Sequence, residues 1–321
     1  MLHVRFILNT FVSGPQAWFF VAEDRGYFAA EGLEVTFVPG DTLANAVPKV
    51  ASGAFDLGYG DLNAVITLAA EAPGTAPTAV FIMHNTSPYT IAVAADGPVR
   101  TPRDLPGRRL LSHASDAAWK MFDTFAAAAN LDPATVTVTP DARHHRELLP
   151  LVLAGNADGL FGFVNTLASA AIEAGLDPAA FRHIEWRTIV PDLCGAAVIA
   201  SPAFIAAHPD AVRGFVQAVN RALADVVADP EGAIAAVRRR DPDIDVKANL
   251  ARLTGTLALE MAHSDGAIHG IGAVDPARLD RAIDLVTRVK GLARRPETTA
   301  VFDSRFLPAA ADRVRTLART P

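Results

Sequence analysis

The sequence predicts an α/β protein of two lobes, each a βαβαβ doubly wound sheet, with a helical C-terminal region packed on the first lobe. Three observations predict this. One segment nearly repeats itself about a hundred residues later. Strand and helix patterns alternate through the first two thirds of the chain, and only helical patterns follow. A chain of 321 residues that is 50% hydrophobic is long enough for two such lobes.

The internal repeat relates residues 53–63 to residues 155–165 without a gap. Its matching positions are Gly53, Asp56, Gly60 and Asn63 in the first copy and Gly155, Asp158, Gly162 and Asn165 in the second. Two lobes of one design are the simplest explanation of such a match. We expect the repeated residues to surround a ligand.

The first lobe alternates strands and helices from its N-terminus. Its expected strands are Val4–Leu8, Leu33–Val38 and Leu57–Tyr59, and its expected helices are one opened by Pro15 and ended near Gly26, Leu43–Ser52 and Leu62–Ala72. Pro48 is expected to delay or kink the second of these helices. The βαβαβ order implies a parallel sheet with right-handed crossovers.

The second lobe repeats this order, and helices complete the chain. Its expected elements are strand Arg109–Leu111, helix Asp116–Asn130, strand Thr135–Val138, helix 146–154, strand Leu160–Phe161 and helix Thr166–Ala174. After residue 200 we expect helices Pro202–Ala207, Asp210–Ala228, Glu231–Arg239, Val246–Ala262 and Pro276–Val289.

Two crossings between the lobes set the domain boundaries. Strands Ala79–Met83 and Ile91–Ala95 are expected to leave the first lobe, and Ala196–Ala200 to return. Lobe one is therefore 1–87 with 200–321, and lobe two is 88–199. We expect the two crossings, near Pro88 and near Gly195, to form a hinge on which the lobes close around a ligand.

Composition excludes several classes of protein. The net charge is −6 and no block of Lys or Arg occurs, so we expect no nucleic-acid partner. Cys194 is the single cysteine, which excludes a disulfide within the chain and a thiolate metal cluster. No apolar run approaches the ~20 residues of a membrane span. Residues 1–3 lead directly into a strand, so the protein is cytoplasmic if Met1 is the natural start, and periplasmic or membrane-anchored outside the cytoplasm if a signal was removed.

Ligands of doubly wound sheets bind beyond the carboxyl ends of the strands, where six loops meet here. The loops are 10–16, 39–43, 58–63, 112–119, 139–145 and 161–165. With His84 near the hinge, their candidate ligand-binding residues are Thr10, Phe11, Gln16, Thr42, Tyr59, Asp61, Asn63, Ser112, His113, Ser115, Asp116, Phe161, Phe163 and Asn165. Such polar and aromatic side chains suit a small heterocycle or a zwitterion.

Structural roles remain open for several of these residues. Asn63 and Asn165 stand where helix N-caps belong, and an N-cap at a cleft can also contact a ligand. Ser115 and Asp116 are ordinary helix starters. His84 is either a satisfied structural histidine or a donor in the cleft. The pair His144 and His145 lacks a third ligand at metal-binding spacing, so we expect no metal site.

Several segments resemble the family that includes thiamine-pyrimidine synthase and the sulfonate, nitrate, taurine and thiamine-precursor binding proteins of ABC importers. The fairly specific element is Gly26-Tyr27-Phe28 followed by Glu31-Gly32-Leu33. Further matching segments are Ala51–Gly58, Pro102–Arg109, Leu153–Asp158, Ser201–Phe204 and His208–Val212. The resemblance covers almost the whole chain and implies the type II periplasmic-binding-protein fold.

The departures from the family concern its enzymes. Their cysteine-rich run near the second crossing is reduced here to Cys194, and residues 58–64 contain neither their cofactor-binding Lys nor their His. We therefore expect no catalytic residues and no cofactor, neither pyridoxal phosphate nor iron. Arg143 stands among acidic residues in the six loops, which disfavours sulfonate or nitrate as the ligand.

The leading hypothesis is a monomeric solute-binding protein of an ABC importer. It would hold an aminopyrimidine thiamine precursor or another aromatic heterocycle in the cleft between its lobes and meet the permease transiently. The alternative is a cytoplasmic enzyme of the same fold that acts on a thiamine- or menaquinone-type precursor. A signal peptide encoded upstream of Met1 would favour the first hypothesis, and a natural start at Met1 the second.

Overall fold

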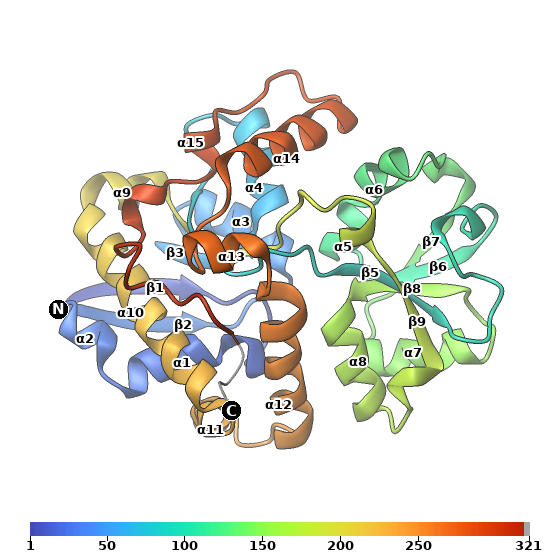
Figure 1. Cartoon of the computed structure of the whole chain (residues 1–321), viewed down its shortest axis with the longest axis horizontal. Coiled ribbons are helices and arrows are strands. Elements are labelled where there is room, and N and C mark those ends of the chain that lie inside the picture. The colour runs from blue at the N-terminus through green and yellow to red at the C-terminus, as the bar shows by residue number, and fades with distance from the viewer. Residues whose placement is uncertain (318–321) are drawn as a thin grey trace. The chain divides into compact units, whose positions relative to one another are not determined.

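The computed structural model describes residues 1–317, which form two compact units. Unit 1 combines residues 1–86 with the chain from Cys194 onward, and unit 2 is Ser87–Leu193. Residues 194–199, expected in the second lobe, belong to unit 1, because the strand that they begin is part of its sheet. Figure 1 shows unit 1 in blue, yellow and red and unit 2 in green.

The sheet of unit 1 has the strand order β2-β1-β3-β10-β4. Its strands are β1 (Leu2–Ile7), β2 (Leu33–Val38), β3 (Leu57–Asp61), β4 (Thr78–Ile82) and β10 (Ala196–Ala200). The first three pair in parallel, as the βαβαβ order predicts. The returning strand β10, for which the sequence predicted no direction, pairs antiparallel with both β3 and β4.

The sheet of unit 2 follows the same plan, with the order β7-β6-β8-β5-β9. Its strands are β5 (Tyr89–Ala94), β6 (Arg109–Ser112), β7 (Thr137–Pro140), β8 (Gly159–Phe163) and β9 (Phe181–Glu185). Here β5, which enters from unit 1, pairs antiparallel with β8 and β9. In unit 1 the third parallel strand, β3, pairs with β10, which follows the second crossing. In unit 2 the third parallel strand, β8, pairs with β5, which follows the first crossing. The predicted two-lobed fold is confirmed.

The repeat has a structural role at the amino ends of the strands. Arg5 of β1 donates from its backbone N to Asp56 Oδ2 (2.8 Å) and from its side chain to the Gly53 carbonyl (3.1 Å). Arg109 of β6 makes the same two bonds to Asp158 (2.8 Å) and to the Gly155 carbonyl (3.2 Å). The expectation that all repeated residues surround a ligand is wrong for these Gly and Asp positions, because ligands bind at the opposite, carboxyl ends.

The glycines of the repeat end helices. Gly53 (φ 76°) and Gly155 (φ 75°) adopt the left-handed conformation one residue after the C-caps of α3 (Leu43–Ala51) and α7 (His145–Leu153). Only glycine adopts this conformation without strain, so the helices stop and the strands begin at equivalent places. Helix α3 begins at Leu43 and continues through Pro48, so the expected delay of its start is wrong.

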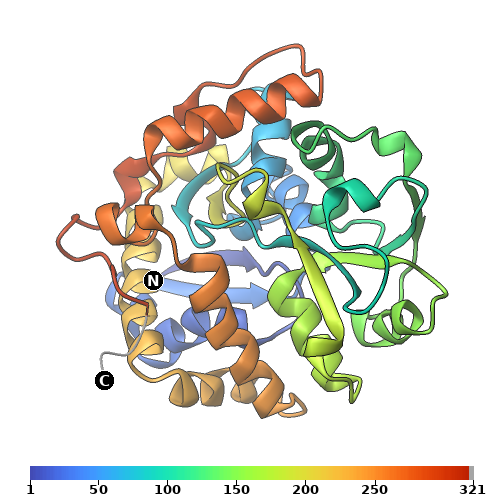
Figure 2. The same ribbon diagram turned by 45° about the vertical axis from the view of Figure 1, so that its right-hand side comes forward.

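Helices cover the sheet of unit 1. They are α1 (Ala17–Asp24), α2 (Tyr27–Ala30), α3, α4 (Leu62–Glu71), α9 (Pro202–Ala207), α10 (Pro209–Ala228), α11 (Pro230–Arg240), α12 (Val246–Gly255), α13 (Ser264–His269), α14 (Pro276–Val289) and α15 (Thr298–Val301). Helix α10 packs against α1 and α2 over an aromatic core in which Phe6 stacks on Phe215 (5.2 Å between centroids). Helix α14 packs against α4, the light blue helix beside it in Figure 2. The predicted C-terminal helices on the first lobe are confirmed.

The expected helix Val246–Ala262 is regular only in its first part. Helix α12 ends at Gly255, and residues Thr256–Met261 form a π-helical turn. Such turns are rare, and those that do occur are frequently found at functional sites. This turn carries a buried carboxylate, Glu260.

The helices of unit 2 are α5 (Ala117–Lys120), α6 (Phe122–Ala128), α7 and α8 (Val164–Glu173). Figure 1 shows α5 and α6 on one face of the sheet and α7 and α8 on the other. The expected single helix Asp116–Asn130 breaks at Met121. Alternate residues of β8 serve the two faces: Leu160 packs with α7 and α8, and Phe161 with Phe122 of α6.

Among residues 1–317, no helix combines the length and the apolar character that a membrane crossing requires.

Candidate functional site

The carboxyl ends of β1, β3 and β4 lie along one edge of the unit 1 sheet. Asp61 ends β3, Tyr59 lies two residues before it in the same strand, and His84 follows β4 by two residues. All three side chains are buried. The strand order of the sheet therefore brings together residues that the sequence places in separate loops.

Tyr59, His84 and Glu260 form a buried polar cluster at this edge. The Tyr59 hydroxyl lies 3.0 Å from His84 Nε2, and Glu260 Oε2 lies 3.5 Å from the same nitrogen. His84 Nδ1 is buried and has no hydrogen-bond partner within residues 1–317. A buried imidazole nitrogen of this kind is a position that water or a ligand can satisfy.

The cluster holds its groups in defined protonation states. Burial lowers the pKa of His84 to about 3. Burial, with a contribution from Glu260, raises the pKa of Tyr59 well above its usual value. At neutral pH the imidazole and the phenol are therefore both uncharged. In this state the Tyr59 hydroxyl can donate to Nε2, which places the imidazole proton on the unpartnered Nδ1.

The loop after β1 is held by Gln16. Its Nε2 donates to Asn9 Oδ1 (2.6 Å) and to Thr10 Oγ1 (3.3 Å), and its Oε1 accepts from the backbone N of Ser13 (2.7 Å). The predicted site residue Gln16 thus shapes the loop from a fully buried position. Phe11 at the loop tip is 55% exposed, and the Arg252 guanidinium lies 5.6 Å from its ring centroid.

The N-caps of α4 and α8 are not the asparagines that the sequence predicted. Asp61 is the N-cap of α4 and accepts from the backbone N of Asn63 (2.7 Å), and Phe163 is the N-cap of α8. Asn63 and Asn165 lie one residue inside their helices, so their expected assignment as N-caps is wrong. Asn63 Nδ2 instead donates to the Cys194 carbonyl (2.8 Å), which ties α4 to the returning crossing. Thr42 caps α3 by accepting from Asn45 N (3.2 Å).

The corresponding edge of unit 2 carries a polar loop after β6. Ser112 Oγ donates to the His113 carbonyl (3.0 Å), and His113 Nδ1 accepts from Ser115 N (3.4 Å). Asp116 caps α5 by accepting from Ala118 N (2.8 Å). The structure thus groups Ser112, His113, Ser115 and Asp116 in one turn, as their spacing predicts.

An aromatic cluster lies at this edge of unit 2. Tyr89 contacts both Phe163 (5.6 Å between centroids) and Trp186 (5.5 Å), and Phe125 stacks on Trp186 (4.8 Å). Trp186 is fully buried, and its Nε1 has no hydrogen-bond partner among residues 1–317. Phe163 is half-buried and therefore reachable, whereas Phe161 is fully buried against Phe122.

Sequence reasoning missed Glu260, Tyr89 and Trp186. Tyr89 and Trp186 adjoin the ends of β5 and β9, and β9 itself was not predicted. Tyr89 stands two residues before the predicted strand Ile91–Ala95, and this position was the available signal for it. Glu260 gave no signal, because its importance comes from packing against residues far away in the chain. Within the described residues, His, Cys, Asp and Glu side chains form no group of three that could hold a metal ion.

The sequence and the fold of this chain are similar to those of known proteins. Residues 16–233 match the family model described as NMT1/THI5 like. This chain belongs to the NMT1/THI5-like family. Its fold is that of periplasmic binding proteins: the aliphatic sulphonate binding protein SsuA of Escherichia coli superposes with a TM-score of 0.67 at 14% identity, covering 93% of this chain and 96% of that one.

The curated relatives of this NMT1/THI5-like protein have two kinds of name. It is 26% identical over 222 residues to 4-amino-5-hydroxymethyl-2-methylpyrimidine phosphate synthase of Schizosaccharomyces pombe, covering 66% of this chain and 62% of the synthase. The match therefore spans less than two thirds of the synthase. The chain is 24% identical over 307 residues to the riboflavin-binding protein RibY of Chloroflexus aurantiacus, covering 90% of this chain and 82% of RibY.

Proposed function

We propose that this protein binds a small organic molecule with an aromatic ring and delivers it, unchanged, to an ABC importer. An aminopyrimidine or another nitrogen heterocycle fits the site residues best. The observation that carries the proposal is the aromatic cluster at the carboxyl edge of the unit 2 sheet, where the half-buried Phe163 contacts Tyr89, which in turn contacts Trp186. Family membership and the riboflavin-binding relative support it.

The aromatic and polar side chains at the carboxyl ends of the strands suit a ligand whose ring contains heteroatoms. Aromatic side chains hold flat rings by stacking and edge contacts. Polar groups of the loop after β6, among them the Ser112 hydroxyl and the His113 imidazole, would bond ring nitrogens or exocyclic groups of such a ligand, and each such bond favours a ligand that carries the matching atom. Delivery to an importer implies that the protein works outside the cytoplasm.

One observation favours a second candidate function, an enzyme. The Tyr59 hydroxyl and the Glu260 carboxylate both lie close to His84 Nε2, so the cluster contains groups that can give or take a proton, and relatives of this chain are named as synthases. A pyridoxal phosphate or iron enzyme is disfavoured, because Cys194 is the single cysteine and residues 58–64 contain no Lys or His. The alternative is therefore an enzyme that uses acid–base groups of the chain itself.

A thermal-shift screen tests the proposed function. Pyrimidines, riboflavin-like compounds, sulfonates and amino acids are compared, and a ring compound at 100 times its dissociation constant is expected to add ~2.7 kcal/mol to the free energy of unfolding. Phe163→Ala is then expected to weaken binding of the best compound about tenfold in calorimetric titration, because it removes an accessible ring contact.

Leu153→Ala is the matched control for Phe163→Ala. Leu153 is 39% exposed at the end of α7, remote from the carboxyl edge of its sheet, so its loss should leave affinity unchanged. Stabilisation by none of the ring compounds would contradict the proposed function, as would equal affinities of the Phe163 variant and the wild type.

A further inference from the structure

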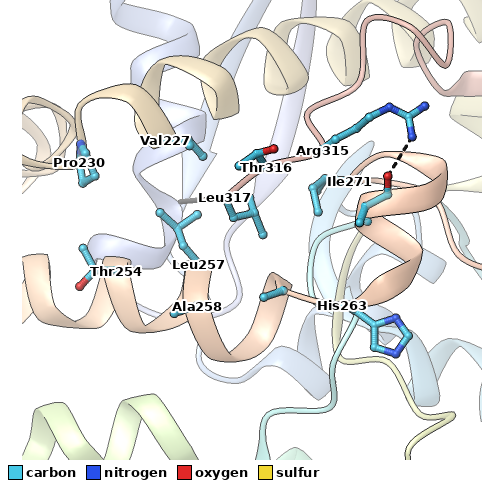
Figure 3. A pocket seen from close by; sticks show the side chains of 13 residues that line it. Val227, Pro230, Thr254, Leu257, Ala258, His263, Ile271, Arg315, Thr316 and Leu317 are labelled. Carbon is cyan, nitrogen blue, oxygen red and sulfur yellow. Dashed lines mark hydrogen bonds between the residues drawn. The ribbon is translucent and has the colours of Figure 1, made fainter. Parts of the chain in front are cut away.

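A separate pocket of about 570 Å³ lies within unit 1 and shares no lining residue with the strand-end site. Figure 3 shows its walls: Val227 at the end of α10, Leu257 and Ala258 of the π-helical turn, Ile271 after α13, and Leu317 of the C-terminal segment. Small-molecule sites typically measure roughly 300–1,000 Å³ and are mainly apolar. This pocket has the size and the lining of such a site.

The pocket has a cationic end. Arg315 supplies its positive charge, and the described lining residues include no carboxylate side chain. Arg315 Nη1 donates to the carbonyls of Ala267 (3.1 Å) and Ile268, and Nη2 donates to Ala310 (3.0 Å). A guanidinium has five N–H groups, and these three bonds use three of them, so the Nε–H and one Nη2–H are not used by these bonds.

The cationic end is held rigidly in place. Arg313 Nη1 donates to the His269 carbonyl (3.0 Å), so both arginines bond to carbonyls at the C-terminus of α13. The backbone N of Ile271 donates to the Val314 carbonyl (2.7 Å). These bonds fasten residues 313–315 along the C-terminal end of α13. The helix dipole also stabilises positive charges at this end. The guanidinium is therefore prepositioned beside an apolar cavity.

We propose that this pocket binds a single-chain amphiphile with a carboxylate head group, such as a medium-chain fatty acid. The chain would lie against Leu257, Ile271 and Leu317, and the carboxylate would accept hydrogen bonds from Arg315. The lining favours this class, since apolar walls suit a methylene chain and one guanidinium suits one carboxylate. The site is distinct from the strand-end site and does not depend on its solute.

The pocket also adjoins the strand-end site through the backbone. Leu257 and Ala258 belong to the same π-helical turn as Glu260, whose backbone carbonyl accepts from Thr86 N (2.9 Å). An amphiphile in the pocket would therefore contact the turn that supplies the carboxylate of the Tyr59–His84 cluster.

Calorimetric titration of the full chain with decanoate, below its micelle concentration, tests the proposal. We expect saturable binding of one decanoate per chain, about fourfold weaker for each methylene removed in the shorter acids. Ala258→Trp fills the pocket from an exposed position and should abolish binding. Ala251→Trp, exposed on α12 and outside the lining, is the matched control and should bind as the wild type does.

Decanol and Arg315→Gln test the head-group assignment. The variant should bind decanoate about tenfold more weakly and decanol with unchanged affinity, because only the acid uses the guanidinium. Absence of saturable decanoate binding, or equal binding by the Ala258→Trp variant, would overturn the site. An equal loss of decanoate and decanol binding in the Arg315 variant would overturn the carboxylate assignment.

Discussion

Replacing Arg278 by Ala is expected to lower the free energy of unfolding by about 3–5 kcal/mol. Arg278 Nη1 lies 2.9 Å from Asp265 Oδ2, and both side chains are almost fully buried. Its other terminal nitrogen donates to the carbonyl of Asn85, next to His84. The substitution would leave a buried carboxylate uncompensated and would release the segment that leaves unit 1. Urea denaturation measures the loss.

The matched control is Arg295→Ala at an exposed ion pair. Arg295 bonds Asp280 and Asp284, whose side chains are 51% and 56% exposed, so its loss should cost at most about 1 kcal/mol. Equal losses in the two variants would contradict the role assigned to Arg278. Arg278→Lys retains a positive charge and should fall between Arg278→Ala and the wild type.

Acid is expected to destabilise the wild type more than a His84→Gln variant. The pKa of His84 is about 3 in the folded protein and about 6.5 in the unfolded chain. Above pH 6.5 the imidazole is neutral in both states and contributes no pH dependence. Between pH 6.5 and 3 the unfolded chain takes up a proton that the folded protein does not, which removes ~1.4 kcal/mol of stability per pH unit.

The His84→Gln variant lacks this proton uptake, so the difference in unfolding free energy between variant and wild type should shift in favour of the variant as pH falls from 6.5 to 4. Denaturation curves at several pH values measure it. Acidic groups that titrate in the same range are common to both proteins and cancel in the comparison. A shift in the opposite direction would show that Glu260 holds His84 protonated, and it would contradict the neutral cluster.

The sequence predicted every strand except β9, with carboxyl ends within about two residues of those observed, because hydrophobic alternation and helix starts are local signals. Tyr59 and His84, both predicted as site residues, are joined by a hydrogen bond. Glu260 could not be predicted, because it reaches this pair only through the packing of the π-helical turn. No local pattern encodes a contact across such a distance in the sequence.

The repeat was recognised from the sequence, but its role was misjudged. Gly53 and Asp56 bond Arg5, and Gly155 and Asp158 bond Arg109, at the amino ends of the strands. The two arginines lie outside the aligned segments, so their part in the repeat is visible only in three dimensions. Identical residues at equivalent places in two lobes can therefore result from a shared architecture as readily as from a shared ligand.

The central claim is that the chain holds and releases a solute without changing it. Prolonged incubation with the best compound from the thermal-shift screen, followed by mass spectrometry of the recovered compound, tests this most directly. We predict that the compound is recovered at its original mass, after binding at one molecule per chain. A new product that accumulates with the wild type, and not with His84→Gln, would contradict it and identify an enzyme.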